Sequence, residues 1–510
     1  MKEMKEMKEI ITILRQRQSV ADHSSLLAST QSDRARLIYS AAFRRLQQKA
    51  QVFSLESNSA VRSRLTHSIE VSHIGRYIVA AICKLIEDSA NINSAEKEFW
   101  RNESLSISNI VETACLMHDI GNPPFGHFGE AAIVEWASSA ETLKAVMESL
   151  CLKPEDTAVA EELLADFVNF DGNPQGFRIL TKLQGEDGYY GLNLTYTQLA
   201  VFLKYTCCPA EKNNTKYFNK KIGYFSTEKN ILESAWGILN MPCNMRHPLG
   251  FLMEASDDIS YCISDIEDGI EKKIITPEHF KEFVIGRLNI VANEFPKSRS
   301  ETQKLLDTIS SKDDFSPISS FLLFKTRLSN LLVKHVAEMF VAKYDKFMSF
   351  KIESEIIYKG SYEYALLKIL KDYTAKYLFT SYEAEKMELS GFAIIKGILD
   401  GFNKLLRLEK HEFSCLVLED IDGIKENKLH IERRLYNRLP SKHLNSYKSA
   451  IMRLPLNSPV WSSEKLKHAL EETDSQVEWN LRAHLIVDFI SGMTDQFSMD
   501  TYQLLKGIKV

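Results

Sequence analysis

The long intervals between helix-breaking residues constrain this chain more than any other feature. Its 510 residues include only 21 glycines and 13 prolines, about 4% and 2.5%, where typical usage is roughly 7% and 5%. A chain so poor in turn residues can form few tight turns. This scarcity favours long helices joined by few loops over a β-sandwich, barrel or propeller. The predicted fold class is therefore mainly α.

Apolar residues recur at helical spacing through most of the chain. Helices are expected over 29–53 (running into an extended end), 65–87, 105–119 and 249–272, with another beginning near Phe125. Ser29, Thr30, Ser32 and Asp33 are the candidate caps of the first helix. The glycine-containing stretch 170–228 is expected to form loops or short strands. Beyond 275 helical patterns dominate, interrupted by polar runs at 298–302 and 420–428, so we expect one region over 1–275 and a second, helical region over 276–510.

Charge and cysteine content limit the possible environments and partners. Sixty-three Lys and Arg residues against 68 Asp and Glu residues give a net charge of −5, which argues against nucleic acid as the main partner. The eight cysteines include no C-x-x-C pair, a pattern that predicts free thiols in a reducing cytoplasm. No apolar run is long enough to span a membrane. We therefore expect a cytoplasmic protein without membrane association.

The string ACLMHDIGNPPFGHFGE, residues 114–130, carries the strongest chemical signal. His118 and Asp119 are adjacent at the end of a helix, and imidazole with carboxylate suits a divalent transition metal. The paired prolines that follow must end that helix. His127 and Glu130, spaced i, i+3 on the next helix, can meet, so the carboxylate can orient the imidazole. A surface pair at a helix start is the alternative.

Further ligands can come from two other helices. His67 is the first candidate, whereas His73, six residues later, lies off its face and is interpreted as structural. Asp257, Tyr261 and Asp265 are spaced i, i+4, i+8 and share one helix face. Burying two carboxylates is costly unless the face binds something, such as a metal or a polyphosphate with its metal. A solvated acidic stripe is the alternative.

Together these residues resemble a known family. His67, His118–Asp119 and Asp257 resemble the H…HD…D signature of the HD-domain metal phosphohydrolases. The longer strings QKAQVF, RLTHSIEVSHIGR, HDIGNPPFGHFGE, FDGNPQGFRIL, KYT, GYFSTE and RHPLGFLMEASDDISYCISDIEDG resemble the bacterial deoxyguanosine triphosphate triphosphohydrolases (dGTPases). They run in order from about residue 48 to 269, while the C-terminal half is less similar. The resemblance implies an HD-domain helical core with an additional helical C-terminal region. It also implies hydrolysis of dGTP to deoxyguanosine and inorganic tripolyphosphate, by attack of water at the α-phosphate.

The resemblance also implies roles for individual residues. The metal ligands would be His67, His118, Asp119 and Asp257, with Asp258 as the alternative to Asp257. His127, held by Glu130, would be the proton donor, although a base or nucleophilic role stays open. The implied substrate-binding residues are Arg64, Lys204, Tyr205 and Lys221 for the phosphates, Gln51, Tyr261 and Asp265 for the sugar, and Asn173 in the pocket lining.

Cofactor and partners follow from the same resemblance. The metal would be manganese or magnesium, with cobalt, iron or nickel as alternatives. The substrate would be dGTP and the assembly a homo-oligomer, a hexamer in similar proteins, with possible modulation by single-stranded DNA. Two alternative functions remain: an HD phosphohydrolase with broader dNTP or alarmone specificity, and a nucleic-acid-binding oligomer with a vestigial metal site.

Overall fold

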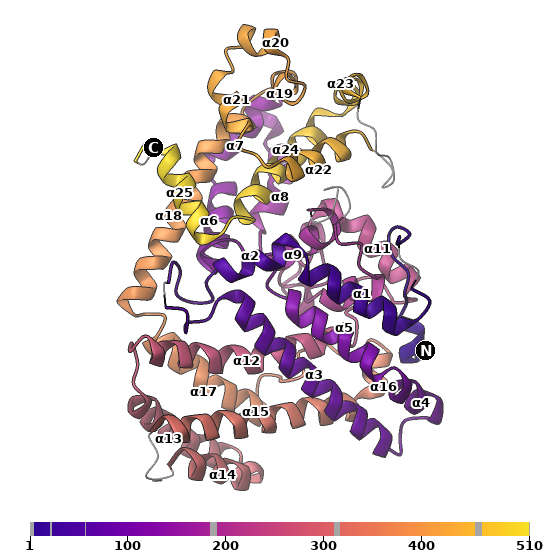
Figure 1. The fold of residues 1–510 in the computed structure, drawn as a ribbon, viewed down its shortest axis with the longest axis vertical. Helices are drawn as coiled ribbons and strands as arrows, with labels where there is room; N and C mark the ends of the chain where they lie inside the picture. The colour runs from indigo at the N-terminus through magenta and orange to yellow at the C-terminus, as the bar shows by residue number, and fades with distance from the viewer. Residues whose placement is uncertain are drawn as a thin grey trace.

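The protein is built from helices (Figure 1). The computed structural model describes residues 5–20, 23–56, 58–183, 191–310, 317–453 and 462–508, and of these it leaves out the side chains of 262 and 317–319. Over those ranges it contains no β-strand. Two isolated bridges pair Arg15 with Thr195 and Ala50 with Ser63. The expected mainly-α fold class is confirmed.

The helices of the first half vary from five residues to 25. They are α1 (Leu26–Ile38), α2 (Ala41–Arg45), α3 (Arg64–Asp88), α4 (Ser94–Asn102), α5 (Ser104–Met117), α6 (Gly126–Ala137), α7 (Ala140–Ser149), α8 (Thr157–Val168), α9 (Gly172–Arg178), α10 (Tyr196–Phe202), α11 (Lys229–Ile238) and α12 (Gly250–Glu271).

The second half continues in the same way. Its helices are α13 (Pro277–Glu294), α14 (Arg299–Ser310), α15 (Pro317–Ala342), α16 (Tyr344–Met348), α17 (Tyr362–Tyr377), α18 (Tyr382–Leu406), α19 (Lys410–Val417), α20 (Ile421–Glu426), α21 (His430–Tyr436), α22 (Ser441–Ile451), α23 (Ser463–Glu472), α24 (Ser475–Ser491) and α25 (Asp495–Leu505). Short 3₁₀ or π turns form η1 (Met7–Ile10), η2 (Leu46–Gln48), η3 (Pro154–Asp156), η4 (Ile179–Leu183), η5 (Pro209–Glu211), η6 (Tyr217–Asn219), η7 (Ser226–Glu228) and η8 (Pro296–Ser298).

Three of the expected helices lie where the sequence predicts them: α3, α5 and α12 match 65–87, 105–119 and 249–272 to within two residues. A helix also begins at Gly126, next to Phe125. The stretch 170–228 contains short helices and turns, and its residues 184–190 lie outside the described residues.

The first expected helix, 29–53, is wrong in two respects. Ser25 caps α1, because its side chain accepts a hydrogen bond from the Ala28 N–H. All four candidate caps lie inside that helix: Ser29, Thr30 and Asp33 are buried there, and Ser32 accepts a hydrogen bond of 3.2 Å from Arg36. The helix then stops, since Ser40 caps a separate helix, α2, through the Phe43 N–H.

The polar runs expected to interrupt the C-terminal helices are themselves largely helical. Residues 298–302 lead from η8 into α14, and 420–428 contain α20. The Asp420 side chain accepts a hydrogen bond from the Gly423 N–H and so caps α20. Polar composition alone does not break a helix whose first turn is capped and whose other face is buried.

The close packing of α3 on α5 brings the first two candidate ligands together. Val71, Ile78, Ile82 and Ile86 form the buried face of α3. A Cβ atom built on Gly75 would lie 2.8 Å from Cys115 Sγ. The two helices can therefore approach this closely because the residue between them has no side chain.

The buried apolar residues form two large clusters. Cluster one combines the N-terminal segment, α3 to α5, α10 to α12 and α13 to α17. Cluster two combines α6 and α8 with the C-terminal helices α18, α19, α22 and α24, which lie in the upper part of Figure 1. The turn between α5 and α6 connects the two clusters. A division into regions at residue 275 stays a prediction.

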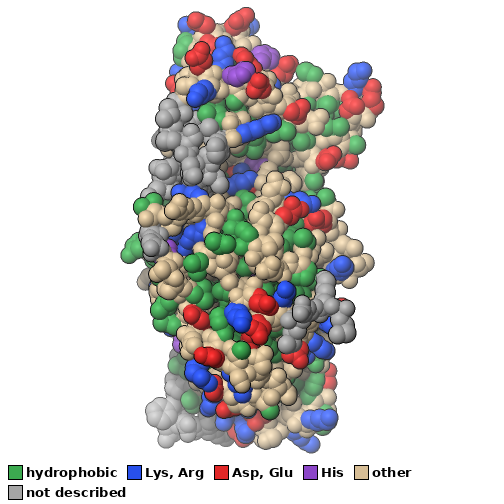
Figure 2. All heavy atoms as spheres, turned by 90° about the vertical axis from the view of Figure 1, so that its right-hand side faces the viewer, with side chains coloured by type: hydrophobic (Ala, Val, Ile, Leu, Met, Phe, Trp, Pro, Cys, Tyr) green, Lys and Arg blue, Asp and Glu red, His purple; other side chains and the backbone are tan. Residues whose placement is uncertain are grey.

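Charged side chains of both signs are scattered over the face of the molecule shown in Figure 2. On the face shown in Figure 2, Lys and Arg are interspersed with Asp and Glu over the described residues, in keeping with the small net charge of −5. Among the described helices, none is both long enough and apolar enough to cross a bilayer.

Candidate active site

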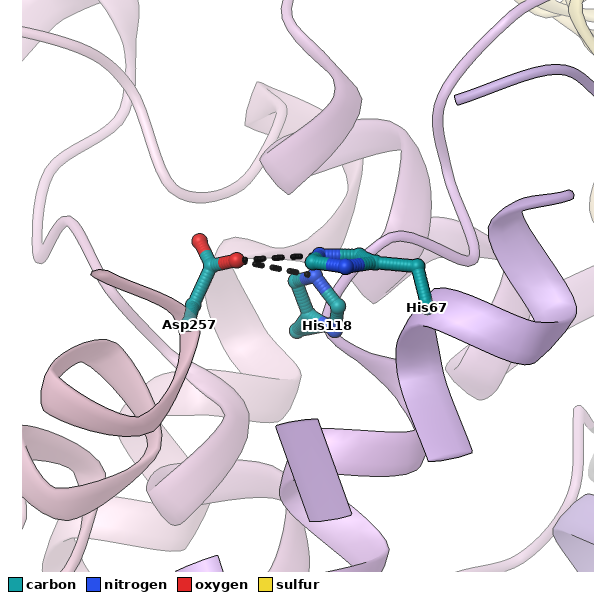
Figure 3. Close-up of side chains that lie close together, drawn as sticks. All are labelled: His67, His118 and Asp257. Atoms are coloured by element: carbon teal, nitrogen blue, oxygen red, sulfur yellow. Dashed lines mark hydrogen bonds and ion pairs between the residues drawn. The ribbon is translucent and has the colours of Figure 1, made fainter. Parts of the chain in front are cut away.

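Three side chains from three different helices converge at the centre of the candidate site (Figure 3). His67 Nε2 lies 3.3 Å and His118 Nε2 3.5 Å from the same oxygen, Asp257 Oδ1. One potential ligand atom from each residue lies within 4.8 Å of the other two. Two imidazoles and a carboxylate at this spacing suit a divalent metal ion.

The ring of His118 is oriented by the end of α5. His118 is the C-cap residue of that helix, and its Nδ1 lies 2.7 Å from the Cys115 carbonyl oxygen. A ring nitrogen can bond to a carbonyl only by donating, so Nδ1 carries a proton and Nε2 faces the centre. A backbone contact that fixes the tautomer in this way is common for metal-binding histidines.

The electrostatics of the group favour a positive charge at its centre. Burial lowers the pKa of His118, but the Asp119 and Asp257 carboxylates outweigh burial and raise that pKa to about 9. Burial raises the pKa of Asp257, yet the neighbouring His118 holds it well below its usual range. A bound cation would therefore take the place of a proton that the site already stabilises.

Asp119 lies beside this group and is held by its neighbours. Its Oδ1 is 3.6 Å from His118 Nε2 and accepts a hydrogen bond of 2.8 Å from Asn122 Nδ2. Its Oδ2 accepts a hydrogen bond from Arg64 Nη1. Burial raises the pKa of Asp119, but His118 and Arg64 together lower it to about 2. Asp119 is thus ionised and oriented next to the three converging residues, but is not one of them.

The two adjacent carboxylates of α12 point in different directions. Asp257 faces the two histidines, whereas Asp258 Oδ1 accepts a hydrogen bond of 2.9 Å from Lys371. Neighbouring positions on a helix differ by about 100°, so only one of the two can face α3 and α5.

His127 and Glu130 form the pair that their spacing predicts. His127 Nδ1 lies 2.7 Å from Glu130 Oε2, and Glu130 Oε1 accepts a hydrogen bond of 2.8 Å from the Gly172 N–H. The His127 side chain is 80% exposed, whereas that of Glu130 is 12% exposed. The hydrogen bond from Glu130 raises the pKa of His127. A fixed carboxylate therefore holds an accessible imidazole.

The cations expected to contact phosphates are each paired with a carboxylate. Lys221 Nζ donates to Asp171 at 2.7 Å, and Lys204 Nζ lies 3.5 Å from Glu254. Burial lowers the pKa of both ammonium groups, but the paired carboxylates outweigh burial and raise it. Tyr205 is buried beside Lys204. Arg64 pairs with Asp119, and a Cβ atom built on Gly126 would lie 2.6 Å from Arg64 Nη2.

The residues expected to contact the sugar contain buried acceptors. Asp265 is fully buried, and among the described residues neither of its carboxylate oxygens meets a hydrogen-bond donor in good geometry. The buried Oε1 atom of Gln51 also lacks a described donor. Burial and the neighbouring Asp268 raise the pKa of Asp265 well above its usual range. Tyr261, one turn before Asp265, lies with its ring centroid 6.4 Å from that of His67.

Asn173 is held within its own turn. Its side-chain amide and its backbone N–H both donate to Asp171 Oδ1, the cap of α9. The other oxygen of Asp171 accepts from Lys221. Asp171 thus connects Asn173 with Lys221.

Sequence reasoning misses four residues that surround these groups: Lys49, Asp171, Glu254 and Asp495. Asp171 had a local signal, since an aspartate before Gly-Asn-Pro is a typical helix cap. Glu254 lies one turn before Asp257 in the same string, yet its pairing with Lys204 needs the fold. Lys49 and Asp495 have no local signal, because their partners are distant in the sequence.

A large surface hollow lies elsewhere on the molecule and does not mark the candidate site. A surface hollow of about 720 Å³ lies between α14, α15 and α17 and is lined by Arg327, His335 and Glu363 among others. It contains none of the predicted site residues. The grouping of metal-ligand side chains therefore decides the position of the candidate site.

Comparison with known proteins identifies a domain that overlaps part of the candidate site. The family model described as "HD domain" matches residues 64–169. That span contains His67, His118–Asp119, His127 and Glu130, whereas Asp257 lies beyond it. The HD domain implies a divalent metal, and the donor set described above fits one.

Sequence similarity to individual proteins covers nearly the whole chain. A probable deoxyguanosinetriphosphate triphosphohydrolase of Pseudomonas aeruginosa is 34% identical over 504 residues, which covers 96% of this chain and 94% of the relative. The deoxyguanosinetriphosphate triphosphohydrolases of Yersinia enterocolitica and Yersinia pestis are both 35% identical, over 96% of this chain and 95% of each relative. This protein therefore belongs to the deoxyguanosinetriphosphate triphosphohydrolase family, whose members are HD-domain phosphohydrolase enzymes.

Proposed function

We propose that this enzyme hydrolyses dGTP to deoxyguanosine and inorganic tripolyphosphate. The observation that carries the proposal is the convergence of His67, His118 and Asp257, in a chain about 35% identical to relatives named for that substrate. Asp119, oriented by Arg64 and Asn122, would complete the ligand set. His and carboxylate donors accommodate manganese or magnesium, and also cobalt, iron or nickel.

The cation's contribution is that of a Lewis acid, since a bound divalent ion polarises the phosphoryl group and makes a water molecule more nucleophilic. The chain itself supplies orientation and charge neutralisation, on which phosphoryl transfer mainly depends. Arg64 is suited to neutralising developing charge, because its guanidinium is buried next to Asp119 and Gly126 and cannot easily move away.

His127 is proposed to protonate the 5′ oxygen as the nucleoside leaves. A nucleoside alkoxide is a poor leaving group, so proton donation is needed in the transition state. The hydrogen bond of Nδ1 to Glu130 leaves the exposed Nε2 free to face substrate. The raised pKa of His127 keeps a larger fraction of the imidazole protonated near neutral pH. A role for His127 as base or nucleophile is the alternative.

The remaining predicted residues would bind the triphosphate and the sugar. Lys204, Lys221, Tyr205 and Arg64 supply cationic and hydroxyl groups suited to phosphate oxygens. The 3′-hydroxyl has one proton to donate, and the buried acceptors of Asp265 and Gln51 are the two candidates to receive it. Tyr261 would pack against the deoxyribose and exclude a 2′-hydroxyl, while Asn173 would line the pocket.

Assembly as a homo-oligomer, specifically a hexamer, modulation by single-stranded DNA and a cytoplasmic location stay predictions from the sequence. The broader-specificity alternative, an enzyme for several dNTPs or an alarmone, retains the same metal centre. The binding-protein alternative, with a vestigial metal site, does not require turnover.

A product assay on the purified protein tests the reaction. All four dNTPs and a guanosine alarmone are supplied with Mn²⁺ or Mg²⁺, and phosphorus NMR identifies the phosphate product. We expect tripolyphosphate from dGTP. Orthophosphate or pyrophosphate as the product would contradict the proposed reaction, and similar rates on all dNTPs would favour the broader alternative. Absence of turnover on every nucleotide would favour the binding protein.

Asp257→Asn and Asp258→Asn form a matched pair for the metal centre. Asp257→Asn should lose Mn²⁺ binding and at least about 10²-fold in kcat, because the only carboxylate of the three converging residues is removed. Asp258→Asn should retain Mn²⁺ binding, since Asp258 pairs with Lys371. The reverse result would move the ligand assignment to Asp258.

A further inference from the structure

The turn that presents His127 has an unfavourable backbone conformation. Phe125 has φ 61° and ψ 18°, and Gly126 has φ 56°, so two successive residues are left-handed. Glycine adopts this region easily, but a residue with a Cβ atom rarely does. His127 follows directly. Its placement therefore depends on whatever holds Phe125 in this conformation.

Asp495, the first residue of α25, makes that contact. Its carboxylate is buried, and Oδ1 accepts a hydrogen bond of 3.1 Å from the Phe125 N–H. Oδ2 accepts one of 3.1 Å from the Ala50 N–H. One side chain near the C-terminal end of the chain thus connects two backbone segments from its N-terminal quarter.

Both segments lead to predicted site residues. Ala50 pairs with Ser63 as an isolated bridge, and the Arg64 N–H donates to the Lys49 carbonyl at 2.9 Å. Gln51, expected at the sugar, comes next after Ala50. Asp495 therefore connects the segment that carries Gln51 and supports Arg64 with the turn that carries His127.

Lys49 reinforces the same junction. Its buried ammonium group donates to the Asn122 carbonyl at 2.6 Å and to the carbonyl of Ser491, the last residue of α24, at 2.9 Å. Asn122 is the residue that holds Asp119. Residues 118–125, between α5 and α6, are called the HD turn. Lys49 connects the end of α24 with Asn122 of this turn, and Asp495 connects the start of α25 with Phe125.

We propose that Asp495 is a positioning residue for the reaction, which holds the left-handed Phe125–Gly126 turn so that His127 is presented to the substrate. Two acceptor oxygens are required, because two main-chain N–H groups converge on the carboxylate. An asparagine can accept only one of these hydrogen bonds, and its amide would place a donor against the other N–H. The inference rests on the proposed function, because its test measures kcat for dGTP.

The first test compares kcat, KM and Mn²⁺ affinity in Asp495→Asn. We expect kcat for dGTP to fall about tenfold or more, with a smaller change in KM and with Mn²⁺ affinity within about threefold of the parent, because the three converging ligands His67, His118 and Asp257 make no described hydrogen bond with Asp495. Thr501→Ala is the control, since it removes a hydrogen bond of 2.7 Å to the Phe497 carbonyl on the same helix without touching Asp495 or the turn. Thr501→Ala should keep the parental kcat.

A double-mutant cycle separates positioning from general destabilisation. When His127→Ala is the background, Asp495→Asn should lower the residual kcat by less than about threefold, because there is no imidazole left to position. An equal loss in both backgrounds would overturn the proposal. Asp495→Ser, which also leaves one acceptor, serves if Asp495→Asn does not fold, and the same outcomes apply to it.

Different results would contradict the proposed function and the positioning role of Asp495. Absence of dGTP turnover in the parent protein would contradict the proposed function before any variant is made. Parental turnover with an unchanged kcat in Asp495→Asn would overturn only the positioning role.

Discussion

Glu130 uses its two carboxylate oxygens for different partners. One accepts from the Gly172 N–H and the other contacts His127. The first contact fixes the carboxylate, so the second fixes the imidazole. The i, i+3 spacing predicts that the two side chains meet, but it cannot predict the anchor on Gly172, which comes from a different helix.

Glu130→Gln tests the electrostatic part of this arrangement. The amide oxygen can still accept from Gly172, but the negative charge that favours protonated His127 is lost, so the pKa of His127 falls. If protonated His127 is the acid, the alkaline limb of the kcat profile moves to lower pH. We expect kcat at neutral pH to drop by about 10–100-fold. The pH profile of kcat is the measurement.

Glu135→Gln is the matched control, because Glu135 is exposed on the same helix. Its profile should superimpose on that of the parent. An unmoved alkaline limb in Glu130→Gln would exclude protonated His127 as the acid.

At the scale of elements, the start of α12 is joined to the N-terminal turn η1 through His247. Its Nε2 lies 3.0 Å from the Ile10 carbonyl, and its Nδ1 accepts from the Leu249 N–H at 3.2 Å. The ring is fully buried. These two contacts require a neutral ring with the proton on Nε2. Burial lowers the pKa of His247 to about 4, opposed by the hydrogen bond to Ile10.

His247 should make stability depend on pH between about 6.5 and 4. In that window the unfolded chain binds a proton that the native ring does not, so stability falls as pH falls. The contribution is fully present above pH ~6.5 and amounts to roughly 3 kcal/mol at most. Denaturant midpoints should fall more steeply in the parent than in His247→Gln, whose amide can still donate to Ile10. Parallel slopes would contradict the low pKa of His247.

Packing between elements also explains Gly121, in the turn after Asp119. A Cβ atom on Gly121 would lie 2.1 Å from both the Gly172 carbonyl oxygen and the Gly176 nitrogen. The backbone of α9 therefore rests directly on the turn after Asp119. The sequence shows glycines and prolines gathered after His118–Asp119, but the reason for Gly121, its contact with Gly172 and Gly176 on α9, is visible only in the fold.

At the scale of the whole molecule, Arg178 joins the two hydrophobic clusters. It lies on α9 between cluster-one residues and pairs with Asp488 on α24, whose neighbours belong to cluster two. It also pairs with the buried Glu228 at 2.9 Å. The guanidinium and both carboxylates are nearly fully buried. The junction between the clusters is therefore ionic as well as apolar.

Arg178→Ala should lower the free energy of unfolding by about 3–5 kcal/mol, because it leaves the buried Asp488 without the cation that it pairs with, whereas Glu228 keeps its pair with Lys182. Urea denaturation measures the change. Lys144→Ala, which breaks an exposed pair with Glu148, is the control and should cost about 1 kcal/mol or less. A similar small effect for Arg178→Ala would show that solvent reaches Asp488 and Glu228.

The sequence by itself determined the helical class, the positions of α3, α5 and α12, and the candidate chemistry of His67, His118 and Asp257. Those features depend on local spacing and on residue type, which the chain displays directly. The predicted caps of the first helix, Ser29, Thr30, Ser32 and Asp33, were wrong, because several residues in succession are able to cap a helix. The structure places the cap at Ser25 and all four predicted residues inside the helix.

Only the tertiary structure decided which groups meet across long stretches of sequence. It turned Asp257 toward the histidines and Asp258 toward Lys371, and it brought Asp495 to Phe125. The physical reason is that a buried hydrogen bond depends on the position of its partner in space. A partner 370 residues away leaves no periodicity or motif by which the pair can be found.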